Sequence, residues 1–143
     1  MLEITRQADY ALRAAMEVAQ LPEGERIPTA TIAERQHIPQ PFQTKIVAQL
    51  VTRGIFESTR GANGGINLAV PAETITVLDI IEAIDGPLTL NRCTLDQNAC
   101  AFSDDCPICG IFIEARDKLE EVFGGTTLAD VTQPKQLVNG FHS

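Results

Sequence analysis

The sequence lacks long apolar runs and has little histidine, and each shortage excludes a class of protein. No apolar run approaches the ~20 residues that span a bilayer, and the first residues, Met1 to Arg6, are followed by polar and charged residues rather than by the apolar block of a signal peptide. The two histidines, His37 and His142, stand alone and suggest no acid-base or nucleophilic catalytic group. We therefore expect a cytoplasmic protein that does not associate with membranes and is not an enzyme.

Excess positive charge is also missing, but the negative charge is unevenly distributed. The 143 residues have a formal net charge of −8. Residues 1–70 carry seven Lys and Arg against seven Asp and Glu, whereas residues 71–143 carry four against twelve. A neutral first half can still present its arginines on one face, while the acidic second half is better suited to solvent or a protein partner than to phosphate.

Apolar periodicity in the first half predicts three helices. An amphipathic helix follows the possible cap Thr5, a second helix covers about residues 29–36, and a third runs over about residues 40–53. The turn His37-Ile38-Pro39 separates the last two, because proline lacks an amide hydrogen and biases the preceding residue away from helix. The second and third helices are therefore expected to be distinct and angled.

Two strand-like runs follow the third helix and predict a hairpin. Residues 55–60 and 65–70 flank Gly61-Ala62-Asn63-Gly64, whose Asn-Gly step favours a tight turn. Three helices and a hairpin make a winged helix-turn-helix, in which the third helix enters the DNA major groove and the wing reaches the backbone or minor groove. The expected DNA contacts are Gln40, Gln43, Thr44, Lys45, Arg60, Gly61 and Gly64. A plain protein-interaction module is the alternative for the same fold.

All four cysteines lie in one short stretch, at Cys93, Cys100, Cys106 and Cys109. Clustered thiols in a cytoplasmic protein are more often ligands of zinc or of an iron-sulfur cluster, or redox sensors, than structural disulfides. Four thiolates can hold a [2Fe-2S] or a [4Fe-4S] cluster, and we favour iron-sulfur. Zinc is the main rival because Cys106 and Cys109 form a C-x2-C pair, although the second pair of a zinc ribbon is missing. A metal-free thiol sensor and an electron-transfer iron-sulfur protein are further alternatives.

The second half contains two more helical patterns. A candidate cap at residues 74–76 precedes an apolar pattern that ends at Asp85-Gly86-Pro87, and a longer pattern runs from Ile108 to Phe123 before Gly124-Gly125. The apolar stripe of the long helix is wider than a lone surface helix needs, so we interpret it as a dimerisation helix. Packing within its own domain is the alternative.

Several of these segments together resemble the iron-sulfur winged-helix transcriptional regulators typified by IscR and NsrR. The similar parts are residues 38–50, the Arg-Gly-x-x-Gly-Gly wing within residues 54–65, and three cysteines after a helix. The resemblance covers nearly the whole chain. It implies a mainly helical homodimer that binds double-stranded promoter DNA, expected to be a repressor, with a winged helix-turn-helix DNA-binding domain at residues 1–72 and a cluster-binding loop and dimerisation helix at residues 73–143.

The resemblance also assigns the cluster ligands. Cys93, Cys100 and Cys106 match the three cluster cysteines of the family. The fourth ligand of the cluster regulator, a histidine three residues after the last cysteine, is replaced here by Cys109, whereas the nitric-oxide sensor uses an aspartate of the first helix from the other subunit, which Asp9 matches. We favour Cys109 because thiolate is the better ligand for iron and no contribution from the partner is needed. Asp9 is the alternative fourth ligand.

Overall fold

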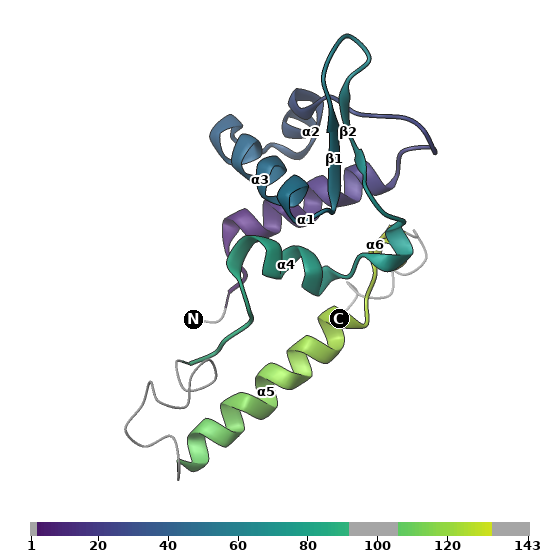
Figure 1. Ribbon diagram of the computed structural model, residues 1–143. Coiled ribbons are helices and arrows are strands. Elements are labelled where there is room, and N and C mark those ends of the chain that lie inside the picture. Colours follow the sequence, from purple (N-terminus) through teal and green to yellow (C-terminus); the bar gives the residue numbers. More distant parts are fainter. Residues whose placement is uncertain (1–2, 92–105, 133–143) are drawn as a thin grey trace.

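The computed structural model describes residues 3–91 and 106–132 and has a mainly helical fold with one small hairpin. In chain order the elements are α1 (Arg6–Ala19), α2 (Thr29–Gln36), α3 (Gln40–Thr52), β1 (Phe56–Thr59), β2 (Gly65–Leu68), η1 (Ala72–Thr74), α4 (Val77–Asp85), α5 (Pro107–Gly124) and α6 (Leu128–Val131). Helices α1, α2 and α3 gather at one end with the hairpin, α4 lies against this group, and α5 runs diagonally away from it (Figure 1). The predicted winged helix-turn-helix and long C-terminal helix are confirmed.

The turn between α2 and α3 has the chemistry that the sequence predicted. His37 ends α2 with a φ of 54°, the left-handed conformation that closes many helices. The amide of Ile38 then donates to the carbonyl of Ala33 at 2.9 Å, and α3 starts immediately after Pro39. Because proline fixes its own backbone and restricts the residue before it, the chain must change direction here.

The wing is an antiparallel pair in which Phe56 lies opposite Leu68 and Thr59 lies opposite Gly65. A third segment joins it, because Ile27 and Ile66 exchange backbone hydrogen bonds of 3.0 and 2.8 Å. This close approach requires Gly65, since a Cβ there would lie 2.7 Å from the carbonyl oxygen of Ile27. The wing is therefore fixed to the segment that leads into α2.

One hydrophobic core joins the three-helix group to the second half of the chain. Ile75, Ile80 and Leu128 belong to the same buried cluster as Ile46 of α3. Helix α4 packs against both α1 and α3. The predicted boundary between two domains at residue 72 thus stays a prediction. Core residues on both sides of this boundary pack together.

Two short elements, η1 and α6, were not expected from the sequence. Thr76 and Thr127 each begin a helix with a capping box, and the two residues form an isolated antiparallel bridge. The amide of Leu128 donates to Ile75 at 2.8 Å, and the amide of Val77 donates to Thr126 at 2.9 Å. The chain that follows α5 is thereby returned to the start of α4.

Helix α5 is the least covered of the long helices among the described residues. Cys109 is its only buried residue, while Ile108, Ile111 and Val122 are more than half exposed. Within the described ranges, no helix is both long and apolar enough to cross a membrane.

Candidate DNA interface and cysteine site

The exposed face of α3 carries three of the predicted DNA contacts. Gln40, Thr44 and Lys45 are all exposed. Gln40 and Thr44 are one turn apart, and the Thr44 hydroxyl donates to the Gln40 carbonyl at 3.2 Å. The first turns of α3 therefore present amide, hydroxyl and ammonium groups, which can bond base edges and phosphates.

Gln43 does not lie on this surface, contrary to the sequence prediction. Its side chain is fully buried, and Nε2 donates to the carbonyl oxygen of Thr29 at 3.4 Å. The reason is helical geometry, because Gln43, Ile46 and Leu50 recur at the three- and four-residue spacing of one face, and that face packs on the core. The spacing of these three residues can be read from the sequence, but the polar side chain of Gln43 led to the prediction that it faces DNA.

The wing residues divide into one exposed cation and two shape-determining glycines. Arg60 is exposed at the end of β1. Gly61 has a φ of 108°, and its carbonyl accepts the amide of Gly64 at 3.0 Å. A Cβ at Gly64 would lie 2.2 Å from the carbonyl oxygen of Thr59. Both glycines thus permit the tight loop that begins directly after Arg60.

Two of the four predicted cysteine ligands lie in the described residues, and both are on the first turn of α5. Cys106 is the half-buried N-cap of this helix, and Cys109, three residues on, is 4% exposed. A helix N-terminus presents unpaired amides and favours negative charge, so the position fits thiolate ligands of a metal or cluster. Cys93 and Cys100 lie outside the described residues, and those described include no group of three potential ligands close enough to hold a metal ion.

The alternative ligand Asp9 is exposed on α1 and paired. Its carboxylate lies 3.0 Å from the guanidinium of Arg13. Arg13 also stacks over the ring of Tyr10, with 5.1 Å from Cζ to the ring centroid, and donates to the carbonyl of Gln36 at 3.4 Å. Ligation by Asp9 would therefore have to compete with this ion pair.

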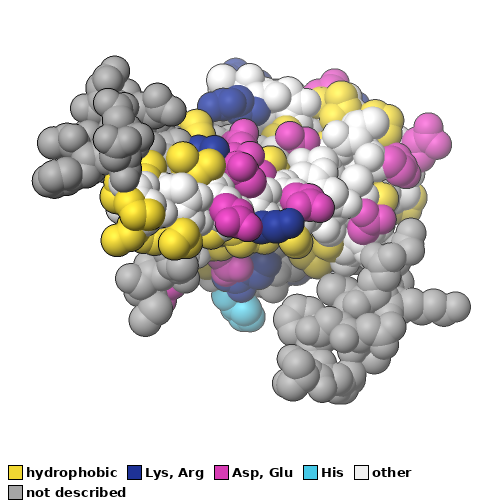
Figure 2. Space-filling view, turned by 90° about the horizontal axis from the view of Figure 1, so that it is seen from below, with side chains coloured by type: hydrophobic (Ala, Val, Ile, Leu, Met, Phe, Trp, Pro, Cys, Tyr) yellow, Lys and Arg dark blue, Asp and Glu magenta, His cyan; other side chains and the backbone are white. Residues whose placement is uncertain are grey.

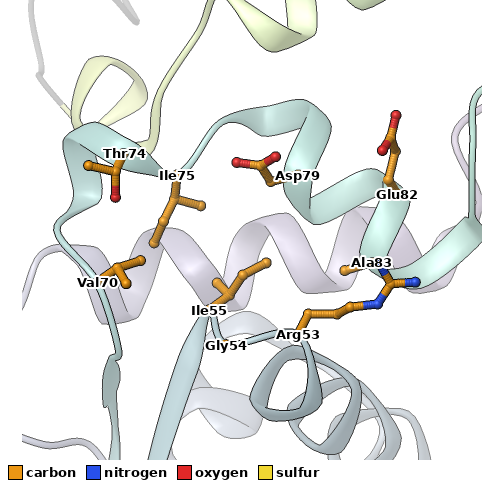
Figure 3. A pocket seen from close by; sticks show the side chains of 9 residues that line it. All are labelled: Arg53, Gly54, Ile55, Val70, Thr74, Ile75, Asp79, Glu82 and Ala83. Carbon is orange, nitrogen blue, oxygen red and sulfur yellow. The ribbon is translucent and has the colours of Figure 1, made fainter.

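A cavity of about 320 Å³ lies where the end of α3 meets α4 (Figure 3). Ile55 and Ile75 contribute apolar walls, and the Arg53 side chain extends toward Ala83. The carboxylate of Asp79 accepts the Thr76 amide at 2.9 Å and so already caps α4.

The chain is similar to a family of transcriptional regulators and to several solved structures. The model of the Rrf2 family, described as an iron-dependent transcriptional regulator, matches residues 4–134. The structure of CymR, the global cysteine regulator of B. subtilis, is similar with 28% identity and a TM-score of 0.78, over 92% of this chain and 97% of that one. IscR of T. potens is similar with 26% identity and a TM-score of 0.77, over 99% and 93%.

A further similar structure is the oxidized form of CymR from Staphylococcus aureus, with 26% identity, a TM-score of 0.74, and coverage of 92% of this chain and 97% of that one. The family match spans nearly all of the chain, including α3, which is the predicted recognition helix, the wing and α5. Members of this family act by binding DNA rather than by catalysis. The chain belongs to the Rrf2 family of DNA-binding transcriptional regulators.

Proposed function

We propose that this regulator is a homodimeric repressor whose affinity for promoter DNA depends on an iron-sulfur cluster held by Cys93, Cys100, Cys106 and Cys109. The observation that carries the proposal is the pair of thiols on the first turn of α5, one of them buried. The similarity to IscR supports an iron-sulfur cluster at this site, although Cys109 stands where the cluster regulator has a histidine. The cluster would supply a redox- and ligand-sensitive centre, and either [2Fe-2S] or [4Fe-4S] fits four thiolates.

In the proposed complex, α3 lies in the major groove. Gln40, Thr44 and Lys45 bond base edges and phosphates, and Arg60 reaches the adjacent backbone or minor groove. The first half of the chain has no net charge, so this local group of donors, rather than the charge of the whole molecule, must attract DNA.

Exposed apolar residues on α5 support the homodimer. Ile111 and Val122 are eleven residues apart, about three helical turns, and Ile108 lies one turn before Ile111, so the three side chains form one stripe. Seen from the side on which α5 lies, hydrophobic side chains border a group of acidic ones (Figure 2). Two copies joined along this stripe would present two recognition helices to half-sites about one DNA turn apart.

The start of the loop that carries the cysteines is connected to the DNA-binding helices through α4. The loop leaves α4, whose last residue, Asp85, accepts hydrogen bonds of 2.7 and 2.9 Å from the hydroxyl of Thr5. Thr5 also caps α1 by accepting from the amide of Ala8 at 3.1 Å. Since α4 packs on α1 and α3, a change in the loop on oxidation, nitrosylation or loss of the cluster would shift the recognition helix.

A metal-free thiol sensor is the second candidate, favoured by the similarity to CymR, of which one structure is an oxidized form. Zinc bound by the same cysteines is a third candidate. Both would use the same DNA-binding surface, so they differ from the proposal in the content of the cysteine site and not in the fold.

The test is anaerobic purification of the wild type and of Cys109→Ala, followed by absorption spectra and analysis of iron, sulfide and zinc. We expect a brown wild type with stoichiometric iron and sulfide that binds duplex DNA differently before and after cluster removal at fixed salt, and a variant that loses the colour. If Cys109→Ala stays brown and loses its colour only when Asp9→Ala is added, the fourth ligand is Asp9.

Other results would reject the proposed function. A colourless wild type that contains zinc would favour the third candidate. A colourless wild type with four titratable thiols and no metal would favour the second. A brown protein with no salt-dependent affinity for duplex DNA would be an electron carrier.

A further inference from the structure

We infer that Gln43 is a positioning residue for DNA recognition, because its buried amide fixes the orientation of α3 against α2 without contacting DNA. The inference rests on the proposed DNA-binding role of α3. It goes beyond that role because it places a determinant of base discrimination in the core, behind the surface that faces the groove.

The position of Gln43 connects the core to the DNA-facing surface. It is fully buried in the first turn of α3, and among the described residues no other polar or charged side chain is buried to this extent. The preceding residue, Phe42, packs on Tyr10 of α1 with 5.7 Å between ring centroids. The following residue, Thr44, is exposed on the proposed DNA surface. A rotation of this turn would therefore displace the residues expected to meet the bases.

The amide of Gln43 is only partly satisfied by the hydrogen bonds around it. Nε2 donates to the carbonyl oxygen of Thr29, but Thr29 is the first residue of α2, where a carbonyl already accepts an intrahelical bond. Oε1 of Gln43 is buried without a hydrogen-bond partner in the described part of the chain. An unpaired buried acceptor destabilises the folded state, so an apolar side chain of similar length would cost less.

The amide nevertheless provides a direction that apolar packing lacks. Other buried side chains of α2 and α3, such as Ile32 and Ile46, are aliphatic, and apolar contacts tolerate small rotations and translations. A hydrogen bond to one carbonyl depends more strongly on distance and angle than an apolar contact does, although the bond from Gln43 Nε2 to Thr29, at 3.4 Å, is at the long end of the hydrogen-bond range. Gln43 therefore selects one orientation of the recognition helix at some cost in stability, as buried polar groups do in other folds.

The test is Gln43→Met, which keeps the side-chain length and removes the amide. A duplex selected by the wild-type protein from a randomised DNA library is compared with a scrambled duplex at one salt concentration. We expect the ratio of the two affinities to fall about tenfold, within the range that one good base contact contributes. The melting temperature should stay the same or rise, because the unpaired acceptor is removed.

Gln49→Met is the matched control. Gln49 lies on the same helix, and its Oε1 is likewise buried without a partner in the described residues, but it lines a hollow with Arg53 and Ala83 on the side of α4. This variant should retain the wild-type affinity ratio. The salt dependence of binding should also be equal in the wild type and Gln43→Met, since Gln43 contacts no phosphate.

Three results would overturn the inference. An unchanged affinity ratio in Gln43→Met would show that the amide orients nothing, and a joint fall of ratio and melting temperature would show an ordinary packing role. A weaker salt dependence would indicate direct contact with DNA. A wild type that selects no duplex would instead reject the proposed DNA function, and this inference with it.

Discussion

At the scale of single residues, backbone contacts of glycine decide the shape of the wing. Gly61 and Gly65 both have positive φ, of 108° and 148°. They differ in their surroundings, because a Cβ at Gly61 would meet no atom within 4 Å, whereas one at Gly65 would lie 2.7 Å from the backbone of Ile27. Substitution of Gly61 therefore tests backbone strain alone, whereas substitution of Gly65 tests backbone strain together with steric overlap.

Gly65→Ala should destabilise the protein by about 2–3 kcal/mol, because the wing must move away from Ile27 and lose its backbone hydrogen bonds. Gly61→Ala should cost only about 1 kcal/mol, from backbone strain alone. Chemical denaturation of the two variants and the wild type measures the difference. Equal losses would show that the contact with Ile27 does not fix the wing.

At the scale of secondary-structure elements, α1 and α4 are joined at their ends. The Thr5 hydroxyl caps α1 and also donates to Asp85 at the end of α4. The two bonds have different consequences, because the cap stabilises one helix while the second bond relates two helices. Substitution of Thr5 removes both interactions and substitution of Asp85 removes only the one between the helices, so the difference between the two variants gives the contribution of the cap.

Thr5→Ala should lower the free energy of unfolding by about 1 kcal/mol, as loss of an N-cap does. Asp85→Ala leaves the cap intact and breaks a solvent-exposed bond, so its loss of stability should be smaller. If this bond carries the proposed coupling, Asp85→Ala should also reduce the difference in DNA affinity between cluster-loaded and cluster-free protein. Fluorescence anisotropy with a labelled duplex measures that difference, and a wild-type value would reject the coupling route.

At the scale of the whole molecule, α5 runs away from the group of DNA-binding helices (Figure 1). Its side chains Ile108, Ile111 and Val122 form an exposed apolar stripe. An isolated helix with this stripe would leave Ile108, Ile111 and Val122 in water. Association of two copies would remove the stripe from water and pair two DNA-binding units.

Ile111→Glu should convert the proposed dimer to a monomer with little change in the stability of each fold, because Ile111 is 63% exposed. Affinity for a two-half-site duplex should fall by about a hundredfold or more, since the two half-sites are then bound independently. Sedimentation velocity and anisotropy measure both effects. Val70→Glu, which changes another exposed apolar residue outside α5, is the control and should remain dimeric.

Local signals in the sequence determined most of the secondary structure. The predicted ends of α2 and α3 are within one residue of the observed ends, because the chemistry of Pro39 and of the residues around it acts within one turn. The hairpin was predicted, although its positive φ angles occur at Gly61 and Gly65 rather than at Asn63-Gly64, and β1 and β2 are shorter than the predicted runs. Of the predicted sites, Gln40, Thr44, Lys45 and Arg60 are exposed as DNA contact requires.

Long-range packing decided the remainder. The bridge between Thr76 and Thr127 joins segments about fifty residues apart, which no local pattern encodes. Gln43 carries a polar side chain suited to DNA, and only the packing of α3 on α2 and the core shows that it is buried. The sequence by itself thus determined the longer helices, the hairpin and the chemical groups that they carry, because those depend on neighbouring residues. Only the tertiary structure showed that a polar side chain such as Gln43 is buried and that the chain after α5 returns to α4, because both depend on residues distant in the chain.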